Sequence, residues 1–234
     1  ITQFQKRVAE HPDKPFLHQP RGGVWKTYSW ADVDREARII ATGLQSKGLN
    51  AGDRVAIFAN NCAEWAIADF AIALAGMISV PIYASAGATT VEYVLTHSDS
   101  KLLFVGGHND KSALDNIPED VICVDFHNPA AEENWQQWLD KYSPLTATVS
   151  PAIDDTYTIV YTSGSTGQPK GVVLTNTNVS AAAIDTAILY PGTDHRVLSY
   201  LPLAHITERS VVLISSLYVD SQIYFNESLA TFIN

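Results

Sequence analysis

The stretch that most constrains this chain is Tyr157-Thr158-Ile159-Val160-Tyr161-Thr162-Ser163-Gly164-Ser165-Thr166-Gly167-Gln168-Pro169-Lys170-Gly171-Val172-Val173-Leu174. Its two ends, 157–161 and 171–174, are rich in β-branched and aromatic residues, which favour strands. Its middle is rich in glycine, serine and threonine and contains a proline, which is typical of a loop. The pattern therefore predicts two strands that hold a short loop from both sides.

The loop combines four hydroxyl side chains, three glycines and one lysine within the ten residues from Thr162 to Gly171. Glycines let the backbone turn sharply and approach a ligand, so that consecutive N–H groups can bind an anion. The hydroxyls add hydrogen-bond donors, and Lys170 adds an isolated positive charge. We therefore predict a phosphate-binding loop. The alternative is a mobile Gly/Ser linker, which the apolar strands on both sides oppose.

Three other loop motifs do not fit these residues. A Walker loop has its lysine directly after the second glycine, whereas Lys170 follows Gly167 by three residues. A nucleophile elbow centred on Ser165 would need glycine at position 163, which is Ser163. No dinucleotide-binding fingerprint is present either.

Outward from the loop, helical and strand patterns alternate along the chain, which predicts an α/β fold with mainly parallel sheets covered by helices. We expect capping boxes at Ser29 with Asp32, Asn61 with Glu64, and Thr89 with Glu92. We expect helices at 30–47, 132–141, 176–189 and 206–218, with two more ending near 75 and 98. We expect strands at 54–58, 78–82, 102–105, 121–124, 157–161 and 171–174.

Composition excludes some classes of function. The 234 residues, 46% of them hydrophobic, are enough for one domain or two. The formal net charge of -10 disfavours a nucleic-acid partner, because phosphate attraction needs a basic surface. Cys62 and Cys123 lack the spacing of a metal site or a disulfide framework. We interpret both as buried hydrophobic residues in a reducing compartment, the cytoplasm.

Neither a secretion signal nor a membrane span is predicted. The start, Ile1 to Arg7, has no initiator methionine and no basic-then-apolar layout, so we interpret it as a trimmed end. The run from Trp65 to Tyr83 has Asp69 as its one charged residue, but Gly76 and Pro81 divide it into a helix and a strand. Peripheral contact with a membrane stays open.

The loop and three other blocks carry a family resemblance. The blocks are Tyr161-Thr162-Ser163-Gly164-Ser165-Thr166-Gly167-Gln168-Pro169-Lys170-Gly171-Val172, Thr27-Tyr28-Ser29-Trp30 with Gly52-Asp53-Arg54-Val55-Ala56-Ile57, Ala75-Gly76-Met77-Ile78-Ser79-Val80-Pro81-Ile82-Tyr83, and Tyr200-Leu201-Pro202-Leu203-Ala204-His205-Ile206-Thr207-Glu208-Arg209. Together they resemble the superfamily of acyl-CoA synthetases, luciferases and peptide-synthetase adenylation domains. The last block resembles the form seen in long-chain fatty acid–CoA ligases.

The resemblance implies a two-step reaction. A fatty acid carboxylate attacks the α-phosphate of ATP with Mg²⁺ present, and coenzyme A then displaces AMP from the acyl-adenylate. By position in the family's loop, the β- and γ-phosphates would be bound by Ser163, Gly164, Ser165, Thr166 and Gly167. Thr162 would bind phosphate and contact the metal, and Lys170 would add charge beside it. Thr166 and Lys170 are the candidate catalytic residues.

His205 has two interpretations. Its position in the family block places it on the wall of the acyl pocket, as a substrate-binding residue. The alternative is a core histidine that pairs with a nearby carbonyl at the start of the helix 206–218. Its spacing from Glu208 could also suit a metal pair, but further ligands are lacking.

The resemblance also implies how the chain is organised. Residues 1–65 would be the first part of a discontinuous α/β subdomain, residues 66–199 a second subdomain with the loop at 161–172, and residues 200–234 a return to the first. The adenine, ribose and lid motifs are missing, so we expect an inactive N-terminal fragment without the C-terminal lid. Adenylation of an aryl or amino acid, or a non-catalytic nucleotide- or acyl-binding module, remains as an alternative. Oligomeric state is not predicted.

Overall fold

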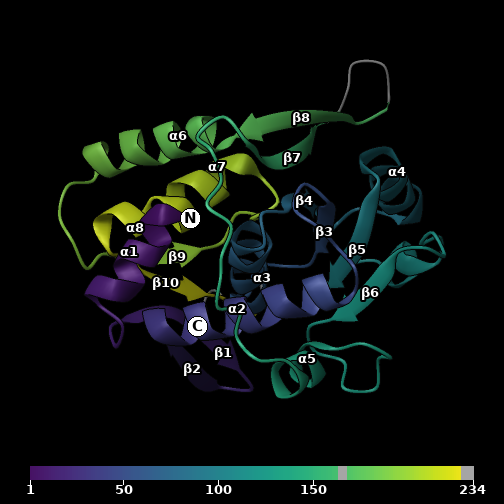
Figure 1. Cartoon of the computed structure of the whole chain (residues 1–234), viewed down its shortest axis with the longest axis horizontal. Helices are drawn as coiled ribbons and strands as arrows, with labels where there is room; N and C mark the ends of the chain where they lie inside the picture. The colour runs from purple at the N-terminus through teal and green to yellow at the C-terminus, as the bar shows by residue number, and fades with distance from the viewer. Residues whose placement is uncertain (163–167, 228–234) are drawn as a thin grey trace.

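The computed structural model describes residues 1–162 and 168–227 (Figure 1). Its helices are α1 (Thr2–Glu10), α2 (Trp30–Ser46), α3 (Ala63–Leu74), α4 (Ala88–Ser98), η1 (Lys111–Leu114), α5 (Trp135–Lys141), α6 (Asn176–Leu189), α7 (Ile206–Glu208), η2 (Arg209–Ile214) and α8 (Ser216–Val219). Its strands are β1 (Pro15–Arg21), β2 (Val24–Ser29), β3 (Arg54–Phe58), β4 (Ile78–Ile82), β5 (Ser100–Val105), β6 (Ile122–Asp125), β7 (Thr156–Thr162), β8 (Lys170–Thr175), β9 (Arg196–Ser199) and β10 (Gln222–Phe225).

The larger sheet has the strand order β6-β5-β3-β4-β7-β8. Its neighbours pair in parallel except β7 and β8, which form an antiparallel hairpin at one edge. Neighbouring parallel strands need a crossover connection, usually a helix, because the chain must return to the same edge of the sheet before the next strand begins. The predicted mainly parallel sheet is confirmed.

This sheet is the middle of three layers. Val55 and Ile57 of β3 point into a core shared with α2 and α3, whereas Ala56 and Phe58 point into a second core shared with α4. Side chains alternate between faces along a strand, so a strand that is buried on both faces reads as a continuous apolar run. The three layers explain why 54–58 shows no polar alternation.

The smaller sheet has the order β2-β1-β10-β9 and joins the first thirty residues to the last described ones. Its β1–β2 hairpin turns at Gly22 and Gly23, both at positive φ (56° and 78°), as a two-residue turn requires. Strands β1 and β2 were not predicted from the sequence, although the Gly-Gly pair is a hairpin signal. By hydrogen bonding, β3 belongs to the larger sheet and β9 to the smaller one. The predicted subdomain boundaries at 65 and 199 stay a prediction, because sheet membership alone does not define a domain.

One of the three predicted capping boxes is confirmed. The Ser29 side chain accepts a hydrogen bond from the N–H of Asp32, and the Asp32 carboxylate accepts one from the N–H of Ser29. The other two are wrong: α3 begins after Cys62 and α4 after Gly87, each without a side-chain cap. Asn61 is instead used in a tertiary contact described below, which a local pattern cannot reveal.

Three further expectations need correction. Cys62 is buried, but Cys123 is exposed, because β6 is an edge strand with one uncovered face. The helix predicted from 132 begins at Trp135, capped by Asn134. The helix predicted at 206–218 contains the π-helical segment η2 between α7 and α8. In the described parts of the chain, no helix has both the length and the apolar content to cross a membrane.

Candidate functional site

A cavity of about 440 Å³ lies where β4 and β7 end. Its lining includes Tyr83, which follows β4, Tyr161 and Thr162 at the end of β7, Pro169 before β8, and His205. The carboxyl ends of parallel strands are where ligands bind in open α/β sheets, because the connecting loops diverge there. The fold therefore brings two predicted site residues, Thr162 and His205, to one cavity.

Thr162 and Lys170 are directly opposite each other in the β7–β8 hairpin. Both side chains are exposed. Within residues 1–162 and 168–227, the Lys170 side chain has no ion pair or hydrogen bond, so its charge is free to meet an anion. The predicted phosphate-binding residues Ser163, Gly164, Ser165, Thr166 and Gly167 lie outside the described residues.

His205 is exposed at the start of α7, so the interpretation as a core histidine is wrong. Its Nδ1 accepts a hydrogen bond of 3.1 Å from the N–H of Thr207, which caps the helix. In the neutral ring the proton is then on Nε2, which leaves a donor for a ligand. The ring lies edge-on to Tyr83, with 6.5 Å between centroids. Its predicted role in acyl binding stays a prediction.

The turn that carries His205 is held by Asn61. The Asn61 amide donates to the Ser199 hydroxyl (2.9 Å) and the Leu201 carbonyl (2.6 Å), and its oxygen accepts from the N–H of Leu203 (2.8 Å). Asn61 follows β3, so it connects the larger sheet to the end of β9. Its spacing from Glu64 predicted a helix cap, and nothing in the neighbouring sequence indicates this role.

Glu208 holds the same turn from the other side. Its carboxylate accepts from the Ser199 hydroxyl (3.0 Å) and from the N–H of Tyr200 (3.1 Å). Burial raises the pKa of the Glu208 carboxyl, and these hydrogen bonds partly oppose the shift. Both hydrogen bonds end on the same carboxylate oxygen, and the metal pair with His205 that the spacing allowed stays a prediction. Among the described residues, no cluster of three candidate metal ligands includes His205.

Tyr83 is a further residue that sequence analysis did not single out. It lines the cavity with His205 and also a second cavity, of about 420 Å³, next to Asn61 and Pro202. Burial raises the pKa of the Tyr83 hydroxyl, so it remains a neutral donor at physiological pH. The one signal in the sequence was its position after a buried strand.

A buried ion pair anchors the segment that follows His205. Arg209 and Asp69 are both fully buried and form a bidentate pair, in which the Arg209 Nε donates to Asp69 at 3.0 Å. Arg209 also donates to the hydroxyls of Thr158 (2.8 Å) and Ser79 (2.6 Å), and its guanidinium lies 4.6 Å from the Tyr157 ring centroid. The charge of Asp69 within the apolar helix α3 is thereby explained.

A second charged cluster contains Cys62, Glu64 and His127, whose ligand atoms lie within 4.8 Å of one another. Arg21 already donates to the Glu64 carboxylate (2.6 Å) and to the ring nitrogen of His127 (2.8 Å). Burial alone would raise the pKa of Glu64, but His127 and the Arg21 charge lower it. The guanidinium neutralises the site, so this cluster connects β1 to α3 and does not need a metal ion.

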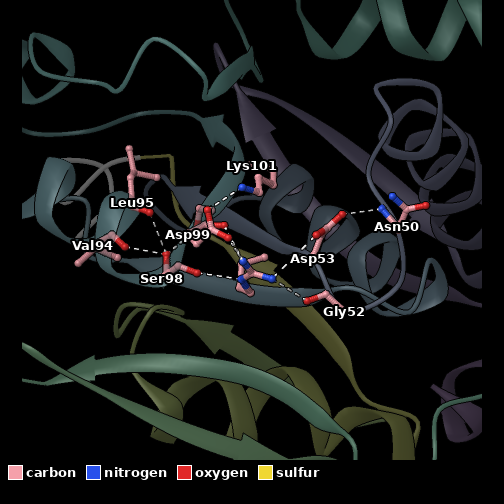
Figure 2. Close-up of polar contacts among 10 residues, drawn as sticks. Asn50, Gly52, Asp53, Val94, Leu95, Ser98, Asp99 and Lys101 are labelled. Carbon is pink, nitrogen blue, oxygen red and sulfur yellow. Dashed lines mark hydrogen bonds and ion pairs between the residues drawn. The ribbon is translucent and has the colours of Figure 1, made fainter.

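At the opposite ends of the strands, Arg54 begins β3 and is fully paired. It donates to the carbonyls of Ser98 (2.8 Å), Gly52 (3.1 Å) and Asp99 (3.1 Å) and pairs with the Asp99 carboxylate. Lys101 also donates to the Asp99 carboxylate, at 2.6 Å. Figure 2 shows this contact. Each contact joins a loop to the start of a strand, so this cluster is structural.

The chain matches the model of a family described as AMP-binding enzyme over residues 4–232, and it belongs to that family. It is 33% identical over 235 residues to fatty acyl-CoA synthetase A of Dictyostelium discoideum, which covers 92% of this chain and 35% of the relative. It is 34% identical over 229 residues to the long-chain-fatty-acid–CoA ligase FadD15 of Mycobacterium bovis, which covers 87% and 37%. The chain thus spans about a third of the length of these relatives.

Solved structures confirm the predicted fold. The inhibitor-bound N-terminal domain of FACL13 from Mycobacterium tuberculosis superposes with a TM-score of 0.82 at 25% identity, covering 97% of this chain and 57% of that one. The o-succinylbenzoate coenzyme A synthetase of Bacillus subtilis, in complex with ATP and a magnesium ion, superposes with a TM-score of 0.80 at 23% identity, covering 99% and 59%. The fold is that of the N-terminal region of adenylate-forming enzymes.

Proposed function

We propose that this chain is the N-terminal, phosphate-binding part of an ATP-dependent long-chain fatty acid–CoA ligase that acts in the cytoplasm. The complete enzyme would join a fatty acid carboxylate to the α-phosphate of ATP and release pyrophosphate. The thiol of coenzyme A would then attack the acyl carbonyl, form the thioester and release AMP. The chain's family and the names of its relatives support this assignment.

The observation that carries the proposal is the position of Lys170 opposite Thr162, which lines the same cavity as His205. A cation without a partner among the described residues, beside a hydroxyl at the end of a strand, suits a polyphosphate. His205, which lines the same cavity, would then lie beside the carboxylate that must approach the α-phosphate. Positioning and preorganised charge are the main contributions that a protein makes to phosphoryl-group chemistry.

The residues on this cavity also fit Mg²⁺ as the partner of ATP. Thr162 offers one hydroxyl oxygen, a hard ligand of the type that Mg²⁺ prefers, and its side chain is exposed. Mg²⁺ in such sites takes most of its ligands from substrate phosphates and water, so one protein oxygen is sufficient. The metal would supply charge neutralisation at the phosphates, while Thr162 and Lys170 would orient them.

The experiment is pyrophosphate exchange into ATP, measured with fatty acids of several lengths. The full-length protein that contains this chain should show exchange that depends on a fatty acid. The 234-residue chain alone should show none above blank, because charge stabilisation in the transition state acts as a unit and the adenine, ribose and lid motifs are missing from it.

Two outcomes would change the proposal. Exchange that depends on an aryl or amino acid instead would redirect it to another adenylating activity. ATP binding by the full-length protein without any exchange would indicate a non-catalytic module.

A further inference from the structure

Helix α4 contacts both strand ends that flank residues 163–167. The Tyr93 hydroxyl donates to the carbonyl of Pro169, which precedes β8, at 3.1 Å. A ring nitrogen of His97, Nδ1, is hydrogen-bonded to the hydroxyl of Tyr161 near the end of β7, at 2.7 Å. Tyr93 and His97 are four residues apart, so they lie on one face of the helix. One helix face thereby reaches the chain before and after the predicted phosphate-binding residues.

The three rings also pack on one another. Tyr93 and His97 stack with their centroids 5.3 Å apart, and the Tyr161 ring stands nearly perpendicular to both, at 6.4 Å and 5.7 Å. Stacked and edge-on pairs of this kind contribute beyond the area that they bury, because the ring edge is positive and the face negative. The rings fix the direction of each hydroxyl or ring nitrogen that touches the hairpin.

Gly171 lets β8 come close to this cluster. A Cβ atom at Gly171 would lie 2.9 Å from Cγ2 of Ile159 and 3.2 Å from Cζ of Tyr161. Any larger residue would therefore push β8 away from the Tyr161 ring. Since β8 is the last strand of its sheet, β7 is its one strand neighbour among the described residues. The hydrogen bond from Tyr93 is thus a second contact, besides the pairing with β7, that fixes the start of β8.

The next face of α4 lines the cavity, through Thr90 and Val94. The helix therefore contacts the cavity and the two strand ends with adjacent faces. The buried residues Val91, Val94 and Leu95 already pack α4 onto the core. Packing alone would not require the hydrogen bonds of Tyr93 and His97. Two hydrogen bonds directed at the strand ends are additional to that packing.

We propose that Tyr93 and His97 are positioning residues, which hold Tyr161 and Pro169 so that Thr162 and Lys170 face the phosphates of ATP. This inference takes its ligand, ATP, from the proposed function. The hydrogen bonds from Tyr93 and His97 to the two strand ends do not depend on that function. Neither residue touches the reacting atoms. Their effect is to reduce the freedom of the hairpin before the nucleotide binds, as preorganised sites require.

The first test uses hydrogen exchange in the chain itself. Tyr93→Phe removes one hydroxyl and keeps the ring, so the backbone amides of Thr162, Lys170 and Gly171 should exchange about three- to tenfold faster, as expected for one lost hydrogen bond. Tyr190→Phe makes the same chemical change at an exposed site and should leave these rates unaltered. Unchanged exchange in Tyr93→Phe would overturn the proposal.

The second test uses the full-length protein. Tyr93→Phe and His97→Leu should each raise the KM for ATP about two- to tenfold and leave the KM for the fatty acid unaltered. His97→Asn, whose amide reaches the position of Nδ1, should restore most of the loss. A lower melting temperature with unchanged KM for ATP, or no rescue by asparagine, would indicate a purely structural contact. If the wild-type protein shows no fatty-acid-dependent exchange, the proposed function fails, and hydrogen exchange alone decides whether α4 holds the hairpin.

Discussion

The charged side chains near the two ends of the larger sheet's strands differ in whether they are paired. Near the beginnings of β3, β4 and β7, Arg54 and Arg209 use every guanidinium nitrogen in a hydrogen bond. Near the ends of β4 and β7, the exposed Thr162 lines a cavity, and the exposed side chain of Lys170 opposite it has no partner within the described ranges. Both regions are polar, but the charged groups are fully hydrogen-bonded in the first and available to a ligand in the second.

The difference separates stability from function. A buried charge must be paired, because an unpaired one costs several kcal/mol, about 3–5 when a partner is removed. A charge at an open strand end is solvated at little cost and remains available to a ligand. We therefore expect substitutions at the strand beginnings to change the free energy of unfolding, and substitutions at the strand ends to change catalysis.

The largest expected effect is on Arg209. Arg209→Met leaves the buried Asp69 carboxylate unpaired and should lower the free energy of unfolding by about 3–5 kcal/mol, as measured by urea denaturation. Arg54→Met is the matched change at a partly exposed arginine. It should cost about 1 kcal/mol through its lost bonds to backbone carbonyls. Equal losses in the two variants would contradict the comparison.

A double variant sharpens this prediction. Asp69→Leu combined with Arg209→Met replaces the pair by apolar groups, so most of the lost stability should return. Failure to recover would mean that the hydroxyls of Thr158 and Ser79, left without their donor, dominate the cost.

Next in size are Lys170→Ala and Thr166→Ala in the full-length protein. Each should lower kcat/KM for ATP about tenfold to a hundredfold, because a hydrogen bond to a charged group contributes about 1.5–3 kcal/mol. The melting temperature of Lys170→Ala should stay within error of the wild type, since the side chain is exposed. Unaltered kinetics in both variants would reject the phosphate-loop assignment.

His205→Ala should have a smaller effect, and a different one. If His205 binds the acyl group, the variant should change the chain-length profile of kcat/KM more than the KM for ATP. Its stability should change by less than about 0.5 kcal/mol, because an exposed side chain leaves no cavity. A lower melting temperature with an unaltered chain-length profile would remove His205 from the site.

The smallest expected effect is the pH dependence of Glu208. Burial raises the pKa of its carboxyl above 4.5, so the folded state binds this proton more tightly than the unfolded state. The stability that protonation contributes is complete below pH 4.5 and is lost as the pH rises through the folded-state pKa. Glu208→Gln, which is neutral throughout and keeps an acceptor oxygen, should therefore melt at or above the wild-type temperature at pH 7.

The control for Glu208 is the pH series itself. The difference between Glu208→Gln and the wild type should shrink as the pH falls below about 4.5, where both side chains are neutral. Glu119→Gln, the same change on the surface, corrects for the general effect of one lost charge. A variant that melts well below the wild type at pH 7 would show that the charged form is required.

Local pattern was sufficient wherever the stabilising contacts are local or repeat along one element. The strand 54–58, the Ser29 cap and the helix 176–189 were all predicted, because a short apolar run, a capping pair and helical periodicity depend on near neighbours. The phosphate-binding role of the loop Thr162–Gly171, inferred from its glycines, hydroxyls and lysine, stays a prediction.

Local pattern failed where the partner is distant in the chain. Asn61 and Glu64 fit a capping box, yet Asn61 contacts a turn about 140 residues away and Glu64 pairs with Arg21. A side chain with hydrogen-bonding capacity satisfies whichever groups the fold brings near, and sequence spacing does not record that choice. The β1–β2 hairpin was missed although its Gly-Gly turn is local, and its strand β1 also pairs with the distant strand β10.

The sequence by itself determined the class of fold, the family resemblance and the composition of the loop, because these follow from residue type and spacing. The tertiary structure decided which of the polar residues are buried and paired and which are exposed and available to a ligand. It paired Asp69 with Arg209 across 140 residues and placed His205 on the cavity beside Thr162. Burial and long-range pairing set the energy of a charged group, and both exist only after the chain has folded.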